Sequence, residues 1–156
     1  MFTIEFDLVA LILCTIIFQV FHRQKQINTR RNSVFYIIIV FVSFSALFRF
    51  LASLAFNSLD TVPVFAAKIL NTLFLFFHIQ VPFFFCIYIF TLTDYFPPNL
   101  PTRIFFFISW LSLLFLILGN PFHEALSYII NGEYKRGPLF LYTYIMSGIY
   151  MLIAAA

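Results

Sequence analysis

Residues 64–93 read VFAAKILNTLFLFFHIQVPFFFCIYIFTLT, and this stretch decides the fold class. Lys68 is the one residue in it that carries a full charge. A membrane-spanning helix needs about 20 mostly apolar residues, so the stretch is long enough to cross a bilayer with some tilt. Its apolar residues run continuously and do not alternate, which indicates a helix and not a strand of a membrane barrel.

The rest of the chain shares this apolar character. Its 156 residues are 63% hydrophobic and 10% charged, whereas a soluble domain carries roughly 25% charged residues. So few charges cannot cover a surface that faces water, and the composition predicts an integral membrane protein. The net charge of +3 does not indicate a nucleic-acid partner, because four of the nine basic residues lie in one short segment between apolar runs.

Five apolar runs are candidates for membrane-spanning helices. Together they predict an all-α, polytopic transmembrane bundle in the cell membrane, with the lipid bilayer as its first partner and one domain over residues 1–156. The first run starts with Glu5 and Asp7 in place of basic residues, so we expect an uncleaved span and not a signal peptide. The expected helices cover about residues 3–21, 34–56, 64–93, 104–119 and 139–156.

The basic residues between the first two runs set the expected orientation. Short loops rich in lysine and arginine stay in the cytoplasm. The segment HRQKQINTRRN, residues 22–32, contains no acidic residue. The N-terminus is therefore expected outside the cell and the C-terminus inside, although Lys135 and Arg136 would then lie outside, against the rule. The basic residues of the segment are Arg23, Lys25, Arg30 and Arg31.

Arg49 is the charged residue placed deepest within an apolar run. An ionisable group in a spanning segment is costly and is a candidate for function. Arg49 stands about 15 residues into the second run, which is roughly 22 Å along a helix, near the outer third of the bilayer. We expect it to pair with Asp7 or Glu5 at the outer end of the first helix. It could serve an outward-facing ligand site, or it could pair only for packing and topology.

The third run carries the intramembrane polar residues Asn71, His78 and Gln80. Asn71 and His78 are seven residues apart and share a helix face, whereas His78 and Gln80 point to different sides. Polar residues in such positions usually make hydrogen bonds between helices. A ligand-binding or pH-sensing role for His78 remains open at this point.

No arrangement of residues with catalytic chemistry stands out. Paired carboxylates on an apolar face, a Ser/His/Asp set and a glycine-rich phosphate loop are all missing from the sequence. His123 and Glu124 are followed by Ala-Leu-Ser, which does not complete a zinc-protease motif. Cys14 and Cys86 have no nearby ligands at metal-binding spacing. We therefore expect no enzyme activity from these residues, no metal and no cofactor.

The segment NPFHEALSYIINGEYKRGP, residues 120–138, is the most polar part of the second half of the chain. Asn120–Pro121 predicts a turn after the fourth span, and the following HEALSYII is compatible with a short helix. Asn131–Gly132 marks a tight turn. Pro138 suits the first turn of the last helix, where its missing N–H costs nothing. We expect a structured external hairpin that caps the bundle.

With this segment, the chain resembles the N-terminal multi-helix membrane regions of bacterial signalling proteins. It is similar to the membrane region found ahead of GGDEF diguanylate cyclase domains in Firmicutes, and to the seven-helix N-terminal sensor region of some histidine kinases. The residues that carry the resemblance are Asn120, Pro121, Tyr128, Gly132, Tyr134, Arg136, Gly137, Pro138, Leu139, Tyr142 and Tyr150, with Asn32 and Phe35 at the second helix.

The resemblance implies a sensory or anchoring module that controls a cytoplasmic output domain. These 156 residues contain no GGDEF motif and no kinase motif, so that domain would lie outside them. It also implies a homodimer formed through the helices, and a small-molecule or anionic ligand at the outer face. The ligand-sensing candidates are Arg49, Glu133, Tyr134 and Arg136.

Two alternatives stay open at this stage. A fragment of a transporter or channel would show a broken helix near the midplane, and Pro82 beside His78 and Gln80 is the only pointer to one. A small structural membrane protein is the other alternative. The chain ends in MLIAAA, without a basic or polar tail, and we expect it to be the front part of a longer protein.

Overall fold

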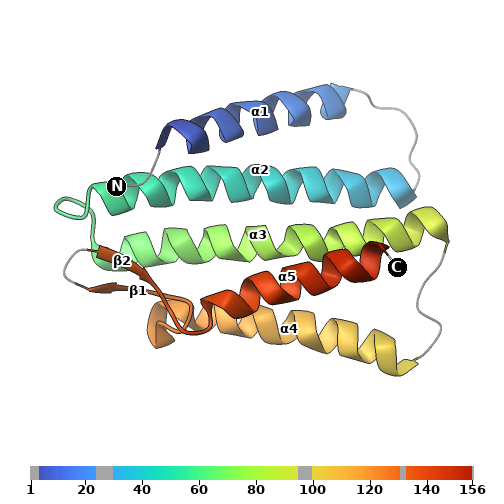
Figure 1. Ribbon diagram of the computed structural model, residues 1–156. Coiled ribbons are helices and arrows are strands. Elements are labelled where there is room, and N and C mark those ends of the chain that lie inside the picture. Colours follow the sequence, from blue (N-terminus) through green and yellow to red (C-terminus); the bar gives the residue numbers. More distant parts are fainter. Residues whose placement is uncertain (1–3, 24–29, 95–99, 131–132, 156) are drawn as a thin grey trace.

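The protein is a bundle of long helices with one small β-hairpin at one end (Figure 1). The computed structural model describes residues 4–23, 30–94, 100–130 and 133–155. Within these ranges the elements are α1 (Ile4–Arg23), α2 (Arg30–Asn57), α3 (Val64–Thr93), α4 (Leu100–His123), β1 (Ser127–Ile130), β2 (Glu133–Arg136) and α5 (Phe140–Ala155).

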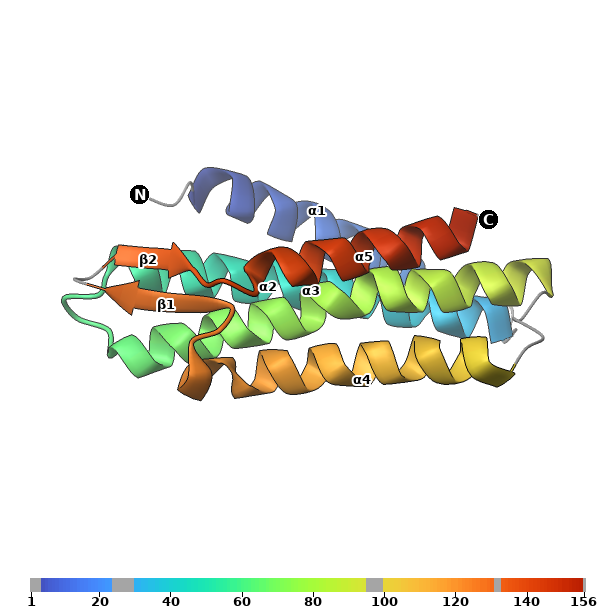
Figure 2. The ribbon, with the colours of Figure 1, turned by 60° about the horizontal axis from the view of Figure 1, so that its bottom comes forward.

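Helix α3 lies at the centre of the bundle and packs against α2, α4 and α5. Helix α1 packs on α2, at the outside of the bundle (Figures 1 and 2). The hairpin, the α2–α3 loop and the C-terminal end of α4 lie together at one end, which we call the hairpin end. The C-terminal end of α1 and the N-terminal ends of α2 and α4 lie at the opposite end.

Three helices are long and apolar enough to cross a membrane: Asn32–Asn57, Val64–Thr93 and Leu100–His123. The apolar parts of α1 and α5 are shorter, at Asp7–Val20 and Phe140–Ala154. With 16 residues, α5 is about 24 Å long, somewhat less than the roughly 30 Å of a hydrocarbon core. The chain is thus helical as predicted, with five helices in its described ranges.

Two predictions about the segment after the fourth helix were wrong. Helix α4 covers Leu100–His123 and not residues 104–119, so Asn120 and Pro121 belong to its last turn and do not form a turn after it. Pro101 is tolerated because it lies in the first turn, where helices need no backbone donor. The second half of HEALSYII forms strand β1 and not a short helix, because it pairs with β2.

The hairpin has a regular antiparallel register, from Ser127 opposite Arg136 to Ile130 opposite Glu133. This register leaves residues 131 and 132, predicted to form a tight turn, between the paired ends, but they lie outside the described residues. Beyond the strands, the Gly137 amide donates to the Leu126 carbonyl at 2.8 Å and the Leu139 amide donates to the Ala125 carbonyl at 3.0 Å. The prediction of a structured hairpin is confirmed.

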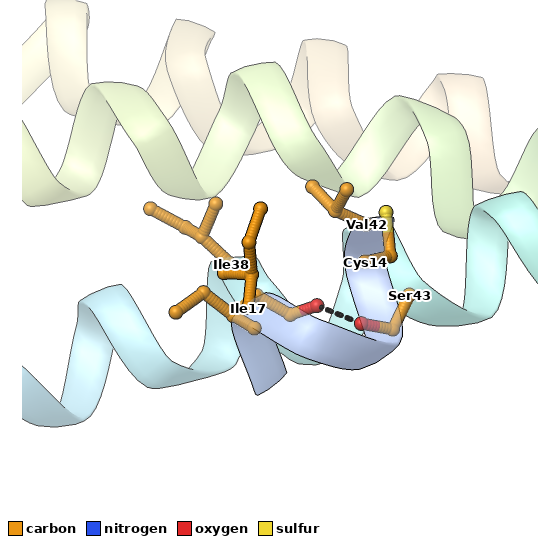
Figure 3. A pocket seen from close by; sticks show the side chains of 6 residues that line it. Cys14, Ile17, Ile38, Val42 and Ser43 are labelled. Carbon is orange, nitrogen blue, oxygen red and sulfur yellow. Dashed lines mark hydrogen bonds between the residues drawn. The ribbon is translucent and has the colours of Figure 1, made fainter. Parts of the chain in front are cut away.

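Helix α1 packs on α2, and none of its described side chains is buried. Between α1 and α2 lies a cavity of about 190 Å³ (Figure 3). The Ser43 hydroxyl in its wall donates to the Ile39 carbonyl of its own helix at 2.9 Å, so the lining offers apolar contacts only. The lining residues are Cys14, Ile17, Ile38, Ile39, Val42 and Ser43.

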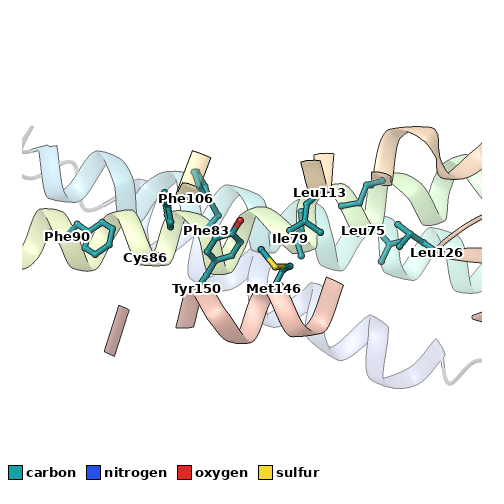
Figure 4. Packing of buried hydrophobic residues seen from close by; sticks show 11 residues of the cluster. Leu75, Ile79, Phe83, Cys86, Phe90, Phe106, Leu113, Leu126, Met146 and Tyr150 are labelled. Atoms are coloured by element: carbon teal, nitrogen blue, oxygen red, sulfur yellow. The ribbon is translucent and has the colours of Figure 1, made fainter. Parts of the chain in front are cut away.

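The core is formed by α3, α4 and α5, and aromatic rings fill its middle (Figure 4). The Phe83 ring of α3 stacks on Phe106 and Trp110 of α4, with ring centroids 4.8 and 4.7 Å apart. From α5, the Tyr150 ring meets the Phe106 ring edge-on, and its hydroxyl is 3.1 Å from the Ser109 hydroxyl. Aromatic rings packed in these geometries stabilise the fold beyond the contribution of their buried apolar area.

At Gly137 the chain passes close to the backbone of the loop that follows α4. A Cβ atom built on Gly137 would lie 2.3 Å from the Ala125 carbonyl oxygen and 2.6 Å from its carbon. Both atoms belong to the backbone, so neither can move aside as a side chain would. Any side chain at this position therefore forces the hairpin away from the end of α4.

We predict that Gly137→Ala lowers the free energy of unfolding by about 1–3 kcal/mol, the usual cost of overpacking, with the loss centred on the hairpin. Gly148→Ala is the matched control, because a Cβ atom there meets nothing within 4 Å and alanine favours a helix. Thermal unfolding of the two variants in the same detergent measures the difference. Equal unfolding temperatures would contradict the close approach at Gly137.

Candidate functional site

The candidate site is a set of polar side chains at the hairpin end, and Asn120 in the last turn of α4 organises it. The Asn120 Oδ1 atom accepts hydrogen bonds from the backbone amides of Leu126 and Ser127, at 2.7 and 3.1 Å. Its Nδ2 donates to the Ser127 hydroxyl at 3.0 Å. Asn71 of α3 donates to the same hydroxyl, also at 3.0 Å. Asn120 thus fixes the start of the hairpin, and Ser127 joins α4 to α3.

Tyr134 of β2 joins the hairpin to two further helix surfaces. Its ring packs against Phe56 of α2, with centroids 4.9 Å apart. Its hydroxyl is hydrogen-bonded with the side chains of Ser127 and Asn71. Tyr134 therefore links α2, α3 and both strands through one side chain. We call Asn71, Asn120, Ser127 and Tyr134 the hairpin network.

Burial raises the pKa of the Tyr134 phenol above its ordinary value. The hydrogen bonds from Ser127 and Asn71 oppose part of this rise, because they stabilise the charged phenolate. The positive charges of Arg49 and Arg136 act in the same direction as those hydrogen bonds. The net effect favours the neutral phenol, which keeps its proton for hydrogen bonding.

Arg49 lies close to the hairpin network and ties α1 to α2. Its Nε is 3.6 Å from Asp7 Oδ1 of α1, and the second carboxylate oxygen accepts a hydrogen bond from the Ser53 hydroxyl. Its guanidinium also lies over the Phe74 ring of α3, 5.2 Å from the centroid. The predicted partnership of Arg49 with Asp7 is confirmed. Arg49 stands about 12 Å before the end of α2 at Asn57, within an apolar span.

A second ion pair lies across the base of the hairpin. Lys68, in the first turns of α3, donates to the Glu124 carboxylate. Glu124 follows the end of α4 and has a left-handed backbone with φ 55°. The pair is partly exposed, with 18% of the Lys68 side chain and 45% of the Glu124 side chain accessible. Exposed pairs contribute little free energy, so this pair orients the chain after α4 more than it stabilises it.

The other sensing candidates have different surroundings. Arg136 is exposed, with its guanidinium 4.9 Å from the centroid of the Phe140 ring at the start of α5. Glu133 belongs to β2 and pairs with Ile130 through the backbone, but its side chain lies outside the described part. The charges of Arg49 and Arg136 both act on the Tyr134 phenol, and the Arg136 guanidinium also lies over the first aromatic ring of α5.

The three polar residues predicted to lie within the membrane have three different environments. Gln80 is buried and accepts a hydrogen bond from Trp110 Nε1 of α4 at 2.9 Å, which confirms the predicted bond between helices. Asn71 is buried under the hairpin and serves its network. His78 lies on the same face two turns further along but is exposed, with its ring 5.4 Å from the Phe74 ring.

The basic residues that set the expected orientation flank the first loop. Arg23 ends α1, and Arg30 and Arg31 begin α2. Their side chains and the whole of Lys25 lie outside the described part of the chain. Their helix ends lie opposite the hairpin end (Figure 1), so this cluster and the hairpin belong to different ends of the bundle.

Ser127, Ser53 and Glu124 are site residues that sequence reasoning did not select. Ser127 and Ser53 are single hydroxyl groups without a motif, and only their neighbours in space reveal what they bind. In the sequence, Glu124 stands out only as part of an incomplete zinc-protease motif. Thr72 of α3 is a further case, because its buried hydroxyl has no hydrogen-bond partner among the described residues.

The described side chains of the site are amides, hydroxyls, charged groups and aromatic rings. In the described ranges, no three His, Cys, Asp or Glu side chains gather where they could hold a metal ion. The site offers cations, amides and hydroxyls around aromatic rings, which suits the recognition of an anionic or polar group. No protein-family model, no curated protein and no solved structure matches the chain.

We predict that Tyr134→Phe lowers the free energy of unfolding by about 1 kcal/mol, the usual worth of a hydrogen bond. The pKa of Tyr134 is raised in the folded state. The neutral phenol therefore contributes its full stabilisation at pH values below the pKa of tyrosine in the unfolded chain, about 10. This stabilisation is lost as the pH rises through the pKa of Tyr134 in the folded protein. Unfolding of the wild type should therefore become easier above about pH 10, and Tyr134→Phe should lack this part of the pH dependence.

The measurement is thermal unfolding in detergent over a series of alkaline pH values. Tyr144→Phe is the control, because Tyr144 is 53% exposed and lies on α5. The same alkaline dependence in wild type and in Tyr134→Phe would contradict a role for the Tyr134 hydroxyl in the hairpin network.

Proposed function

We propose that the chain is a multi-pass membrane protein whose five helices all span the bilayer, with the N-terminus and the hairpin outside the cell and the C-terminus inside. Three helices of spanning length support this, as do Arg23, Arg30 and Arg31 at helix ends opposite the hairpin. Tilt and local thinning of the bilayer accommodate the shorter α1 and α5 at modest cost.

We further propose that this bundle is the sensory or anchoring module of a bacterial signal-transduction protein, and that it has no catalytic activity of its own. The observation that carries the proposal is the hairpin network, in which a surface hairpin binds polar groups of α3 and α4 and lies beside the Arg49–Asp7 pair. A small-molecule or anionic ligand that moved the hairpin would change contacts at several helix ends together.

Such a ligand acts only through its different affinities for two arrangements of the helices. Tyr134 and Arg49 are the residues best placed to respond to it, because the Arg49 charge acts on the Tyr134 phenol. Arg136 and Glu133 belong to the strand that carries Tyr134 and would meet the ligand from the surface. Helix α3 then carries the change through the bundle, since it contacts α2, α4 and α5.

The proposed output is a cytoplasmic diguanylate cyclase (GGDEF) or histidine kinase domain, and it rests on the resemblance alone. Asn120 and Gly137, which carry part of that resemblance, have structural tasks in the hairpin. They therefore support a shared hairpin more directly than a shared output. The alternative of a transporter would need a broken helix near the midplane, but α3 continues through Pro82 without a break.

The orientation is tested by labelling single cysteines in intact cells. In a background with Cys14→Ser and Cys86→Ser, we expect a membrane-impermeant maleimide to label Asp60→Cys in the α2–α3 loop and Lys135→Cys in the hairpin. Arg103→Cys, at the opposite end, should react only after the cells are permeabilised. Labelling of Arg103→Cys in intact cells would overturn the proposed orientation.

The signalling role is tested by reading the coding DNA past the codon for Ala156. A frame that continues into a GGDEF or kinase domain supports the proposal, and the full-length protein with Arg49→Gln or Arg136→Gln should then show altered output activity. A frame that continues into a transport domain, or stops there, would overturn the signalling role while leaving the membrane bundle in place.

A further inference from the structure

His78 has an unusual position for a polar side chain. It lies about 21 Å from the start of α3 at Val64 and a similar distance from its end at Thr93, so it marks the middle of the longest helix. Helix α3 is long and apolar enough to cross a membrane. When it does, His78 lies near the centre of the hydrocarbon layer, where no water is available to bind it.

The described surroundings of His78 leave the hydrogen-bonding groups of its imidazole without partners. The residue is exposed, and its described contacts are the ring contact with Phe74 and the electrostatic interaction with Arg49. No hydrogen bond joins its imidazole to any residue in the described ranges. A polar group left unpaired in hydrocarbon costs several kcal/mol, so another hydrogen-bonding group must cover it from outside these ranges.

We propose that a second copy of this chain covers His78, in a parallel dimer in which the two His78 side chains bind each other across a two-fold axis. Two copies inserted in the same orientation place the same residue at the same depth, so the His78 side chains of the two copies can contact each other. A neutral imidazole has one donor and one acceptor, which makes the pair self-complementary. The neutral form is favoured because charge is costly at this depth.

The face around His78 suits such a contact. The Phe74 ring contacts both the His78 ring and the Arg49 guanidinium, so an aromatic side chain borders the imidazole toward the hairpin end. The Arg49 side chain is 36% exposed and would lie at the edge of the interface. This dimer requires membrane insertion but not the signalling role, and the two proposals therefore fail separately.

The test is disulfide cross-linking in native membranes, with Cys14→Ser and Cys86→Ser as the background. We expect His78→Cys to form a linked dimer on mild oxidation. Ile108→Cys is the control, because Ile108 is 59% exposed and lies at a similar depth on α4. No dimer from His78→Cys, or equal dimer from Ile108→Cys, would overturn the proposed interface.

A second measurement tests the hydrogen bond itself. Resonance energy transfer between labelled copies in vesicles should show a dissociation constant raised roughly three- to thirtyfold in His78→Leu, as expected for one hydrogen bond between helices. His78→Gln should keep most of the affinity, because its amide also has a donor and an acceptor. Unchanged association of His78→Leu would contradict pairing through His78, as would a loss in His78→Gln as large as that in His78→Leu.

Discussion

The structure depends on the need to pair backbone amides where the chain leaves α4 and enters the hairpin. Leu126 and Ser127 are buried and follow the end of the helix, and buried donors without acceptors are costly. Asn120 meets this need, since its one side-chain oxygen accepts from both Leu126 and Ser127. The hairpin is thereby held at a fixed place on the bundle, and Tyr134 and Arg136 are placed with it.

The hairpin network and the Arg49–Asp7 pair lie at the same end of the bundle but hold different parts. The network joins the hairpin to α3 and α4 through amides and hydroxyls. The ion pair joins α1 to α2, and an apolar cavity lies between the same two helices. None of the described side chains of α1 is buried, so the ion pair adds to contacts that lie at the surface of the bundle.

Much of the fold could be predicted from the sequence because long apolar runs leave few alternatives. Continuous apolar runs can only be helices, and α3 was predicted with its bounds at 64–93 as the structure has them. The end of α4 could not be predicted in this way. Asn-Pro usually marks a turn, yet Asn120 and Pro121 lie in the last turn of α4. The Asn120 side chain pairs with the amide of Leu126, beyond the end of the helix.

The candidate site was predictable only in part. Arg49 and its partner Asp7 could be found because a charge in an apolar run needs an opposite charge nearby. Ser127 could not, because a single serine gives no signal until the fold brings Asn71 and Asn120 to it. The sequence also could not show that Asn71 is buried under the hairpin while His78 is exposed.

Hydrogen exchange of Asn120→Ala, measured by mass spectrometry in lipid nanodiscs, tests most directly the claim that this side chain holds the hairpin on the bundle. Ser112→Ala is the matched control, because the Ser112 hydroxyl bonds only to a carbonyl of its own helix. We expect amides of residues 126–136 to exchange roughly five- to hundredfold faster in Asn120→Ala, with the interior of α4 unchanged. Unchanged exchange in the hairpin, or equal acceleration throughout the bundle, would contradict the account.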